Sequence, residues 1–405
     1  MFRILANIAP YYNESTMLKR TLYSTALLLA LLATGCGDAN QKPSALPQID
    51  MNAEYPEKEI CLQDIADVSY IPLETTDEML FEGNLIELSE NGIVVINKMN
   101  NRLLLFYPDG KARYLLSRKG EGPQEYIHLE DVVVDWKRKE IFVSHKGGER
   151  IQVYTLDGSF KRTLKVNESL RQNDMYHFDD EHLLAFKDKM IKGGYNRLVE
   201  PYQPMVLISK EDGHVDSLSY TKDYIASLVI SNLSAQAYIS SPAYVMSGNL
   251  LFMSDMGADT IYTIHKDATL SPYMTRVPSV VSDTEGDYFL YLNGVSDNLD
   301  FITRQSKQLE LGSDFVARDE KTHDLMRDKI SGEIFRSKFK NLDCPTLDID
   351  LRFVAGYDNC AHYPLEAFDL IEALEAGELS GELKTIAEGL KEDDNPVLMV
   401  VKFKE

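Results

Sequence analysis

The chain has 405 residues, enough for one large domain or two ordinary ones, and 44% of them are hydrophobic, as in globular proteins with a substantial core. The formal charge at pH 7 is −22, from 64 acidic and 42 basic side chains. Such a surface repels phosphate backbones, so we expect no nucleic-acid partner.

The first 35 residues are predicted to be a processing segment rather than part of the fold. Lys19 and Arg20 precede an apolar run, Leu22–Leu32, which is shorter than the roughly 20 residues that span a bilayer as a helix. Met17 is an alternative start, which would make residues 1–16 an upstream extension. We therefore assign residues 1–35 to a signal peptide.

The apolar run ends in small residues before Cys36, and this pattern resembles the lipobox of bacterial lipoproteins. Ala33 stands where that motif usually has Leu. The resemblance implies that Cys36 is lipidated and anchors the protein to a membrane. The alternative is an ordinary secretory signal in which Cys36 is incidental. Residues 36–59 are polar and contain proline, and they predict a tether behind the lipidated cysteine.

Three further cysteines, Cys61, Cys344 and Cys360, have spacings that match no zinc site. Export would permit a disulfide, and the sequence does not say which pair would form. Two states of the three cysteines therefore stay open: three free thiols, or one disulfide bridge with one free thiol.

An internal repeat predicts the architecture. Residues 91–120 and 139–165 align on each other, with a basic turn, an aromatic strand and an Asp-Gly turn at the same places. Gly110 and Gly158 of those turns are 48 residues apart. A repeat of this length with four short strands is typical of a β-propeller blade.

Strand-like runs continue through the chain with turns between them. The first two blades are predicted at Phe81–Leu88, Ile93–Asn97, Leu103–Tyr107 and Ala112–Leu116, then at His128–Trp136, Glu140–Ser144, Arg150–Thr155 and Phe160–Val166. Looser candidates for the next blades are His182–Lys187, Met205–Ser209, Val215–Tyr220, Ser241–Met246, Asn249–Ser254, Thr260–His265, Tyr288–Leu292, Leu299–Thr303 and Phe315–Ala317. Asp348–Ala355 would begin a sixth blade, so residues 60–405 are predicted to be one six-bladed, all-β propeller.

The C-terminal region predicts a short helical insertion and the closure of the ring. Residues 364–390 carry helix formers at amphipathic spacing, with Pro364 suited to a first helical turn. Val397–Phe403 returns to strand composition. Because an open ring would expose two sheet edges, we expect this strand to pair with Val68–Leu73.

The segment 117–164 resembles an NHL repeat, with a glycine-rich loop, two strands and an Asp-Gly turn. Together with the lipobox, the chain from about residue 60 onward resembles the NHL-like or TolB-like six-bladed propeller lipoproteins of Bacteroidetes-type envelopes. This resemblance implies a fold and a location outside the inner membrane, but no particular reaction.

Ligands of propellers usually meet the face that carries the loops between blades and the loops between second and third strands. The loop after the first blade places Arg118, Lys119 and Tyr126 there, suited to an anionic or sugar ligand. The alternative is a connector whose glycines serve tight packing. Arg102 and Arg150 occupy equivalent repeat positions and could bind a carboxylate or phosphate, or could pair with acidic neighbours in each blade.

Among eight histidines, His145 lies near the same rim and is the best single candidate for a metal or acid/base role, although the pattern favours a solvated loop histidine over either role. No histidine cluster, serine-hydrolase motif or calcium loop occurs, so we predict no metal, cofactor or catalytic residue. Scattered acidic candidates for a calcium ion in the channel are Asp131, Asp135, Asp255 and Asp259.

The sequence is consistent with two alternative functions. The first is a non-catalytic lipoprotein of the outer membrane, on its periplasmic or surface side, whose propeller face binds a glycan, peptide or protein. The alternative is a propeller hydrolase or lyase with a channel Ca or Zn that acts on an ester or sugar. The missing histidine cluster and calcium loop favour the first function.

Overall fold

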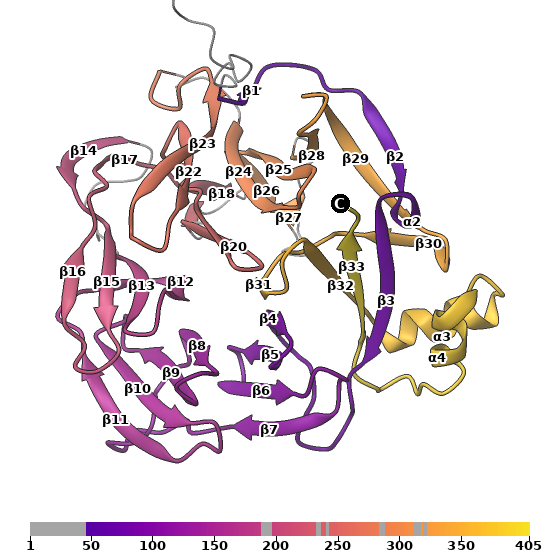
Figure 1. Ribbon diagram of the computed structural model, residues 1–405, viewed down its shortest axis with the longest axis horizontal. Helices are drawn as coiled ribbons and strands as arrows, with labels where there is room; N and C mark the ends of the chain where they lie inside the picture. Colours follow the sequence, from indigo (N-terminus) through magenta and orange to yellow (C-terminus); the bar gives the residue numbers. More distant parts are fainter. Residues whose placement is uncertain are drawn as a thin grey trace, which may run out of the picture. The chain divides into compact units, whose positions relative to one another are not determined.

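The computed structural model describes residues 46–187, 197–231, 236–239, 243–282, 288–311, 317–318 and 322–405. These residues form a six-bladed β-propeller, as the repeat predicts. The blades follow one another round the ring in chain order (Figure 1). The signal peptide, Cys36 and most of the predicted tether lie outside the described residues.

Blades one and two are antiparallel four-stranded sheets that match the two aligned repeats. Blade one consists of β4 (Asn84–Ser89), β5 (Gly92–Asn97), β6 (Arg102–Phe106) and β7 (Ala112–Leu116), and blade two of β8 (Asp131–Asp135), β9 (Glu140–His145), β10 (Arg150–Thr155) and β11 (Phe160–Lys165). Their β-branched and leucine side chains fill the cluster between the two blades. The predicted strands of both blades are therefore confirmed to within a few residues.

The Asp-Gly turns lie between the third and fourth strands of each blade, and each turn packs on the preceding blade. Gly110 and Gly158 have φ of +83° and +76°, a conformation that glycine adopts without penalty. A Cβ at Gly110 would lie 2.2 Å from the Pro72 carbonyl oxygen, and one at Gly158 would lie 1.8 Å from the Tyr114 hydroxyl. The repeated glycine thus serves contact between blades.

Blades three to five have the predicted strands and several that the sequence analysis missed. Blade three consists of β12 (Leu170–His177), β13 (His182–Lys187), β15 (Met205–Ser209) and β16 (Val215–Ser217). Blade four has β20 (Tyr244–Ser247), β21 (Leu250–Met253), β22 (Thr260–Ile264) and β23 (Leu270–Val277), and blade five has β24 (Tyr288–Val295), β25 (Leu299–Ser306), β28 (His323–Asp328) and β29 (Ile334–Asn341). The missed strands β12, β23, β28 and β29 interleave polar or charged residues with their apolar ones and show no continuous apolar run.

The N-terminal segment, which the sequence analysis assigns to the tether, lies against the outer edges of two blades. Strand β1 (Gln48–Asp50) pairs in parallel with β23 of blade four, and β2 (Glu57–Cys61) pairs in parallel with β29 of blade five. The propeller unit therefore begins at residue 46 rather than 60. These short strands gave no sequence signal because most of their residues are exposed or half-buried.

The two ends of the chain close the ring in blade six. Strand β3 (Ala66–Pro72) follows the short helix α2 (Leu62–Ile65) and pairs antiparallel with β33 (Val397–Phe403) along its full length. Strand β32 (Cys360–Leu365) pairs with the other edge of β33. The predicted closure is confirmed. Cys61, Cys344 and Cys360 are all free in the structure.

The predicted helical insertion consists of two helices, α3 (Ala367–Glu375) and α4 (Gly381–Ala387). Their apolar residues pack on the blade-six cluster. Pro364 does not lie in a first helical turn: it belongs to β32, opposite Leu398, on the edge of a three-stranded sheet. Such an edge tolerates the missing proline N–H, so the strand continues past it.

A short segment crosses the axis of the ring. After β30 (Cys344–Ile349), which pairs with β29, the strand β31 (Ala355–Gly356) pairs in parallel with β4 of blade one. On its other side Gly248 of blade four donates to the Val354 carbonyl at 3.0 Å. Because blades one and four are not neighbours, this crossing segment, residues 354–357, runs across the inside of the ring between them (Figure 1).

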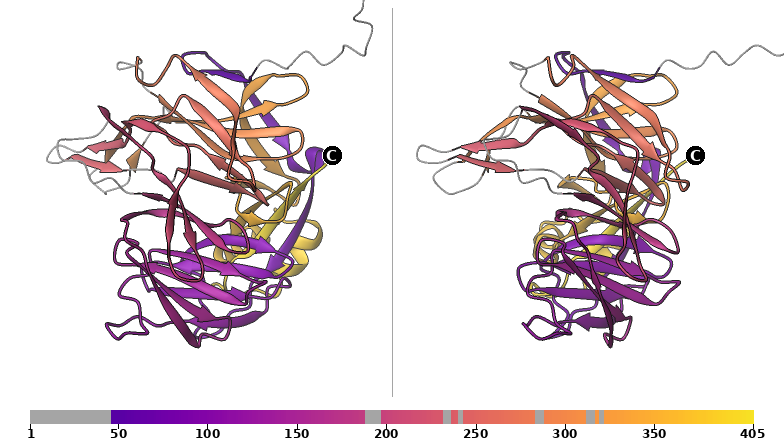
Figure 2. Two further views of the ribbon diagram at one scale, coloured as in Figure 1. Left: turned by 60° about the vertical axis from the view of Figure 1, so that its left-hand side comes forward. Right: turned by 90° about the vertical axis from the view of Figure 1, so that its left-hand side faces the viewer.

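Additional strands extend beyond one face of the ring (Figure 2). They form a pair, β14 (Arg197–Tyr202) with β17 (Lys222–Ile225), and a small sheet of β18 (Leu228–Ser231), β19 (Gln236–Ile239), β26 (Gln308–Leu311) and β27 (Ala317–Arg318). Ala317 therefore lies in this sheet and not in blade five, while the rest of the predicted strand Phe315–Ala317 lies outside the described residues. No helix within the described ranges is long and apolar enough to span a membrane.

Candidate functional site

The two arginines predicted to share a rim do lie on the same face, because each begins the third strand of its blade. Arg102 is half-buried and Arg150 is exposed. Within the described part of the chain, neither guanidinium group forms an ion pair. A shared anion site at this rim therefore stays a prediction.

The loop between blades one and two is mainly a structural connector. Tyr126 is fully buried, and its hydroxyl donates to the Asn101 carbonyl at 2.8 Å and accepts the Arg118 N–H at 3.1 Å. The Arg118 guanidinium donates to the Gly158 carbonyl at 3.2 Å. Lys119 is exposed. Tyr126 thus packs inside the propeller and does not present its ring to a surface ligand, contrary to our expectation.

His145 is a core residue rather than a solvated one. Only 2% of it is exposed, and neither ring nitrogen has a hydrogen-bond partner in the described structure. Burial, with the charges of Lys146 and Arg150, lowers the pKa of His145 to about 4, so its ring is neutral at pH 7. No group of three or more metal-ligating side chains is present among the residues that the structure describes.

The aspartates considered for calcium have protein partners instead. Three of them pair with lysines, and Asp259 accepts the Val280 N–H: the lysine pairs are Asp131–Lys98, Asp135–Lys210 and Asp255–Lys222. These partners account for the acidic residues near the channel without a cation.

A large cavity opens on the opposite face, where the turns between first and second strands lie beside the crossing segment. Its volume is about 930 Å³, in the range of small-ligand sites. Seven carboxylate side chains and only two lysines line it, together with His177 and the aromatic residues Trp136, Phe178 and Tyr357. The carboxylates belong to Glu87, Glu90, Asp135, Asp179, Asp180, Glu181 and Asp358, and the lysines are Lys137 and Lys266.

Glu87 is the central carboxyl group of this acidic cavity. It lies on β4, and its Oε1 accepts the Trp136 indole N–H at 2.5 Å and the Ser89 hydroxyl at 2.8 Å. Burial raises the pKa of Glu87 to about 7, although these two hydrogen bonds act to lower it. Carboxyl groups with such a pKa in a cavity are frequent at functional sites. Glu87 also lines a narrower cavity of about 390 Å³ farther along the channel.

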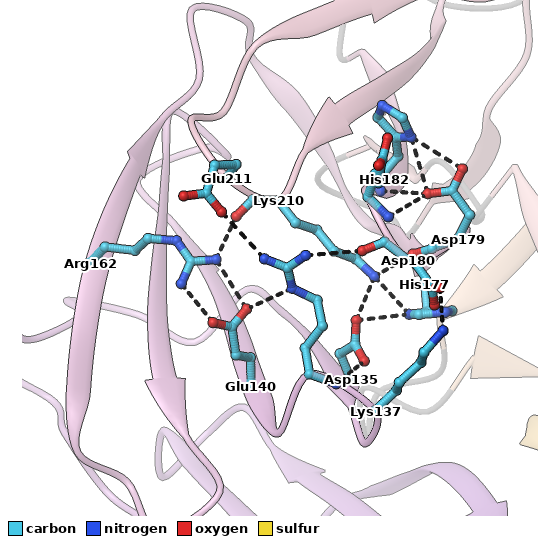
Figure 3. A network of polar contacts seen from close by, with 12 residues as sticks. Asp135, Lys137, Glu140, Arg162, His177, Asp179, Asp180, His182, Lys210 and Glu211 are labelled. Atoms are coloured by element: carbon cyan, nitrogen blue, oxygen red, sulfur yellow. Dashed lines mark hydrogen bonds and ion pairs between the residues drawn. The ribbon is translucent and has the colours of Figure 1, made fainter.

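A buried ion pair supports the wall of the acidic cavity between blades two and three (Figure 3). Lys210 is fully buried, and its Nζ donates to Asp135 Oδ2 at 2.6 Å and to the Asp179 carbonyl, while His177 Nδ1 lies 3.0 Å away. Burial lowers the pKa of Lys210, and Asp135 opposes that shift. Burial and the lysine charge lower the pKa of His177. The pair therefore holds the first turns of both blades together.

A second buried carboxylate lies outside that pair and anchors the outer strands (Figure 3). Arg162 donates to both oxygens of Glu140, at 2.7 and 3.0 Å, and Lys161 and Arg138 also contact it. Burial acts to raise the pKa of Glu140, but these cations outweigh it and hold the pKa at about 2. Arg162 in turn donates to the Lys210 carbonyl, which links both ion clusters.

The family model for a domain of unknown function, DUF4934, matches residues 46–402, which is the whole propeller unit. The chain belongs to the DUF4934 family. A putative exported protein from Bacteroides fragilis is similar in structure, with 16% identity, a TM-score of 0.61, and coverage of 89% of this chain and 99% of that one. A DUF4221-family protein from Bacteroides vulgatus has 9% identity and a TM-score of 0.46, covering 84% and 97%. No curated protein sequence matches.

The predicted rim residues of this DUF4934 propeller lie on the face opposite to the acidic cavity, and of the acidic candidates for calcium only Asp135 lines it. Glu87, Trp136 and His177 were missed, because no motif marks them in the sequence. One signal was available: an acidic side chain lies within the last three residues of the first strand in both aligned blades, at Glu87 and at Asp135. Only the ring geometry shows that such positions meet at the axis.

Proposed function

We propose that the protein is a non-catalytic binding protein of the cell envelope, whose acidic cavity takes a peptide or protein segment with a basic side chain. The observation that carries this proposal is the excess of carboxylates in a cavity of about 930 Å³. Asp135 and Asp180 pair with lysines, Asp179 contacts His182, and Asp358 accepts a hydrogen bond from the Asn249 amide. Glu87, Glu90 and Glu181 have no cationic partner within the described ranges.

Glu87 provides the chemical argument for a cationic group. Its pKa is raised because no positive charge accompanies its burial. A lysine or arginine side chain entering the cavity would supply that charge and favour the ionised carboxylate. Phe178 and Tyr357 line the same cavity and are aromatic residues suited to a cation, whereas the Trp136 ring already has the Arg113 guanidinium 4.9 Å from its centroid.

The direct test measures the binding of the peptides Gly-Lys-Gly and Gly-Arg-Gly by calorimetry, with the acidic peptide Gly-Glu-Gly as the control ligand. We expect the basic peptides to bind, Glu87→Gln to weaken binding by about tenfold, and 0.5 M salt to weaken it further. The matched control is Arg102→Ala with Arg150→Ala on the other face. Equal binding of the acidic peptide by the variant that lacks both rim arginines, or an unchanged affinity for basic peptides in Glu87→Gln, would contradict the proposal.

The rim pair remains a separate proposal for an anionic ligand. Loss of acidic-peptide binding in the double arginine variant, with Glu87→Gln unaffected, would support it. Elemental analysis of purified protein separates both binding proposals from a metal-dependent hydrolase or lyase. Stoichiometric calcium or zinc would favour that enzyme and argue against a purely binding role.

We also propose that Cys36 carries a lipid anchor that holds the protein at the outer membrane. The support is the basic, apolar and small-residue order before Cys36, and the similar fold of a protein described as exported. Metabolic labelling with a fatty-acid analogue tests this, with Cys36→Ser as the control. Equal label in both proteins, or none in either, would refute the anchor.

A further inference from the structure

A second cavity lies beside the crossing segment, lined by residues 350–355 and by strands of blades one, three, four and five. Its volume is about 550 Å³. Met246 and Ala355 line both this cavity and the acidic one, so they form part of the partition. The proposed peptide site gives this second cavity no role.

The polar side chains of this cavity form a short relay with spare hydrogen-bonding capacity. The Asn293 amide donates to the Thr303 hydroxyl at 2.7 Å, and that hydroxyl donates to Asp324 Oδ1 at 2.6 Å. A hydroxyl has one proton, so the relay has a fixed direction. The Asn293 carbonyl oxygen, its second N–H and Asp324 Oδ2 have no partner within the described part of the chain.

Two more planar groups face the same space from the segment that precedes the crossing. Arg352 Nε lies 3.6 Å from Asp350 Oδ2, and Arg352 is fixed by backbone hydrogen bonds to His362. Both side chains are exposed at the edge of the cavity, and Asp350 is close enough to Asp324 for the charge of Asp324 to act to raise the Asp350 pKa while that of Arg352 acts to lower it. The cavity therefore offers both hydrogen-bond donors and acceptors, with two carboxylates and one guanidinium group among them.

Aromatic rings complete the wall of this second cavity. Tyr176, Tyr291 and Phe353 line it and are only half-buried. Phe353 is held in place because it packs on Gly294, where a Cβ would lie 2.0 Å from the ring. Ring faces contact the C–H surface of a sugar, and planar amide, carboxylate and guanidinium groups match pairs of adjacent hydroxyls.

We infer that this second cavity binds a neutral carbohydrate, with Asn293 and Asp324 as its principal hydrogen-bonding groups. A simple anion suits it less, because two carboxylates accompany the one arginine. A simple cation suits it less than the acidic cavity, because Arg352 is present. A polyhydroxyl ligand uses both donors and acceptors at once.

Saturation-transfer NMR of the purified full chain tests the inference with glucose, galactose, mannose, N-acetylglucosamine and their disaccharides. We expect transfer to at least one sugar, and calorimetry should then show at least a tenfold weaker affinity in Asp324→Asn. Asn293→Ala is the second variant, because it removes an amide that no backbone group uses. Circular dichroism and urea unfolding identify any variant that does not fold.

Glu87→Gln is the matched control in the other cavity, and it should leave sugar binding unchanged. Sugar binding that survives in both Asp324→Asn and Asn293→Ala would overturn the inference, as would no transfer to any sugar in the panel. Binding of inorganic phosphate or acetate that displaces the sugar would also overturn it. Because the peptide assay depends on Glu87 and this assay does not, the two proposals fail independently.

Discussion

Replacing Glu87 with glutamine should stabilise the protein at high pH and much less at low pH. Glutamine has nearly the same shape and can still accept the Trp136 and Ser89 hydrogen bonds. It cannot ionise, so it removes the cost of holding a buried carboxylate. The sign follows from the pKa: the folded state favours the protonated acid, so stability that exists at low pH is lost as pH rises.

The size of the effect follows from the pKa of Glu87, which rises from 4.5 to about 7 on folding. Each pKa unit corresponds to about 1.4 kcal/mol, so the full penalty well above pH 7 is about 3.4 kcal/mol. At pH 5.5 the unfolded acid is already largely ionised, and roughly 1.4 kcal/mol of the penalty applies. Between pH 5.5 and pH 8 we therefore expect a change of about 2 kcal/mol in the stability difference between variant and parent.

Urea unfolding of both proteins at pH 5.5 and pH 8 measures this difference directly, since other titrating groups are common to both. Glu90→Gln is the matched control, because it neutralises an exposed carboxylate of the same cavity. A Glu87→Gln effect that is the same at both pH values would refute the assigned pKa. An equal pH dependence in Glu90→Gln would show that the general charge of the cavity, and not burial, is responsible.

Other predictions concern the supporting structure, and urea unfolding measures each of them. Lys210→Met should lower the free energy of unfolding by about 3–5 kcal/mol because it leaves Asp135 charged and buried. Adding Asp135→Asn should restore part of the loss, and strictly additive effects of the two substitutions would refute the coupling between these residues. Gly110→Ala should cost clearly more than Gly332→Ala, since both have positive φ but only the first Cβ meets a backbone oxygen; equal costs would refute the contact argument. Glu140→Gln should destabilise at pH 7 by up to about 3 kcal/mol, and the loss should shrink as pH falls through 4.5 toward 2; a constant loss would contradict its lowered pKa.

The sequence alone predicted most of the inner architecture. Strands such as Ala112–Leu116 and Arg150–Thr155 have their predicted bounds, because alternating apolar side chains and Asp-Gly turns are local signals. Closure by β3 and β33 was also predictable, because two lone strands at the ends of a repeat array have only each other to pair with.

The outer additions were not predictable from local pattern. Strands β1 and β2 carry few buried apolar residues and form because blades four and five offer open edges beside them. Proline is tolerated both in the first turn of a helix and on an edge strand, so Pro364 alone did not distinguish a helix start from a strand. Pairing with β33 places it in a strand. In each case the competing structure depends on a segment far away in the chain.

The sequence by itself determined that this chain is a propeller with repeated blades, since periodic strands and glycine turns are written into neighbouring residues. Only the tertiary structure decided where a ligand could bind. The crossing segment joins blade one to blade four through a few backbone hydrogen bonds that leave no local pattern. Glu87 and Asp324 acquired their environments in this way, because both cavities are built from residues of blades far apart in sequence.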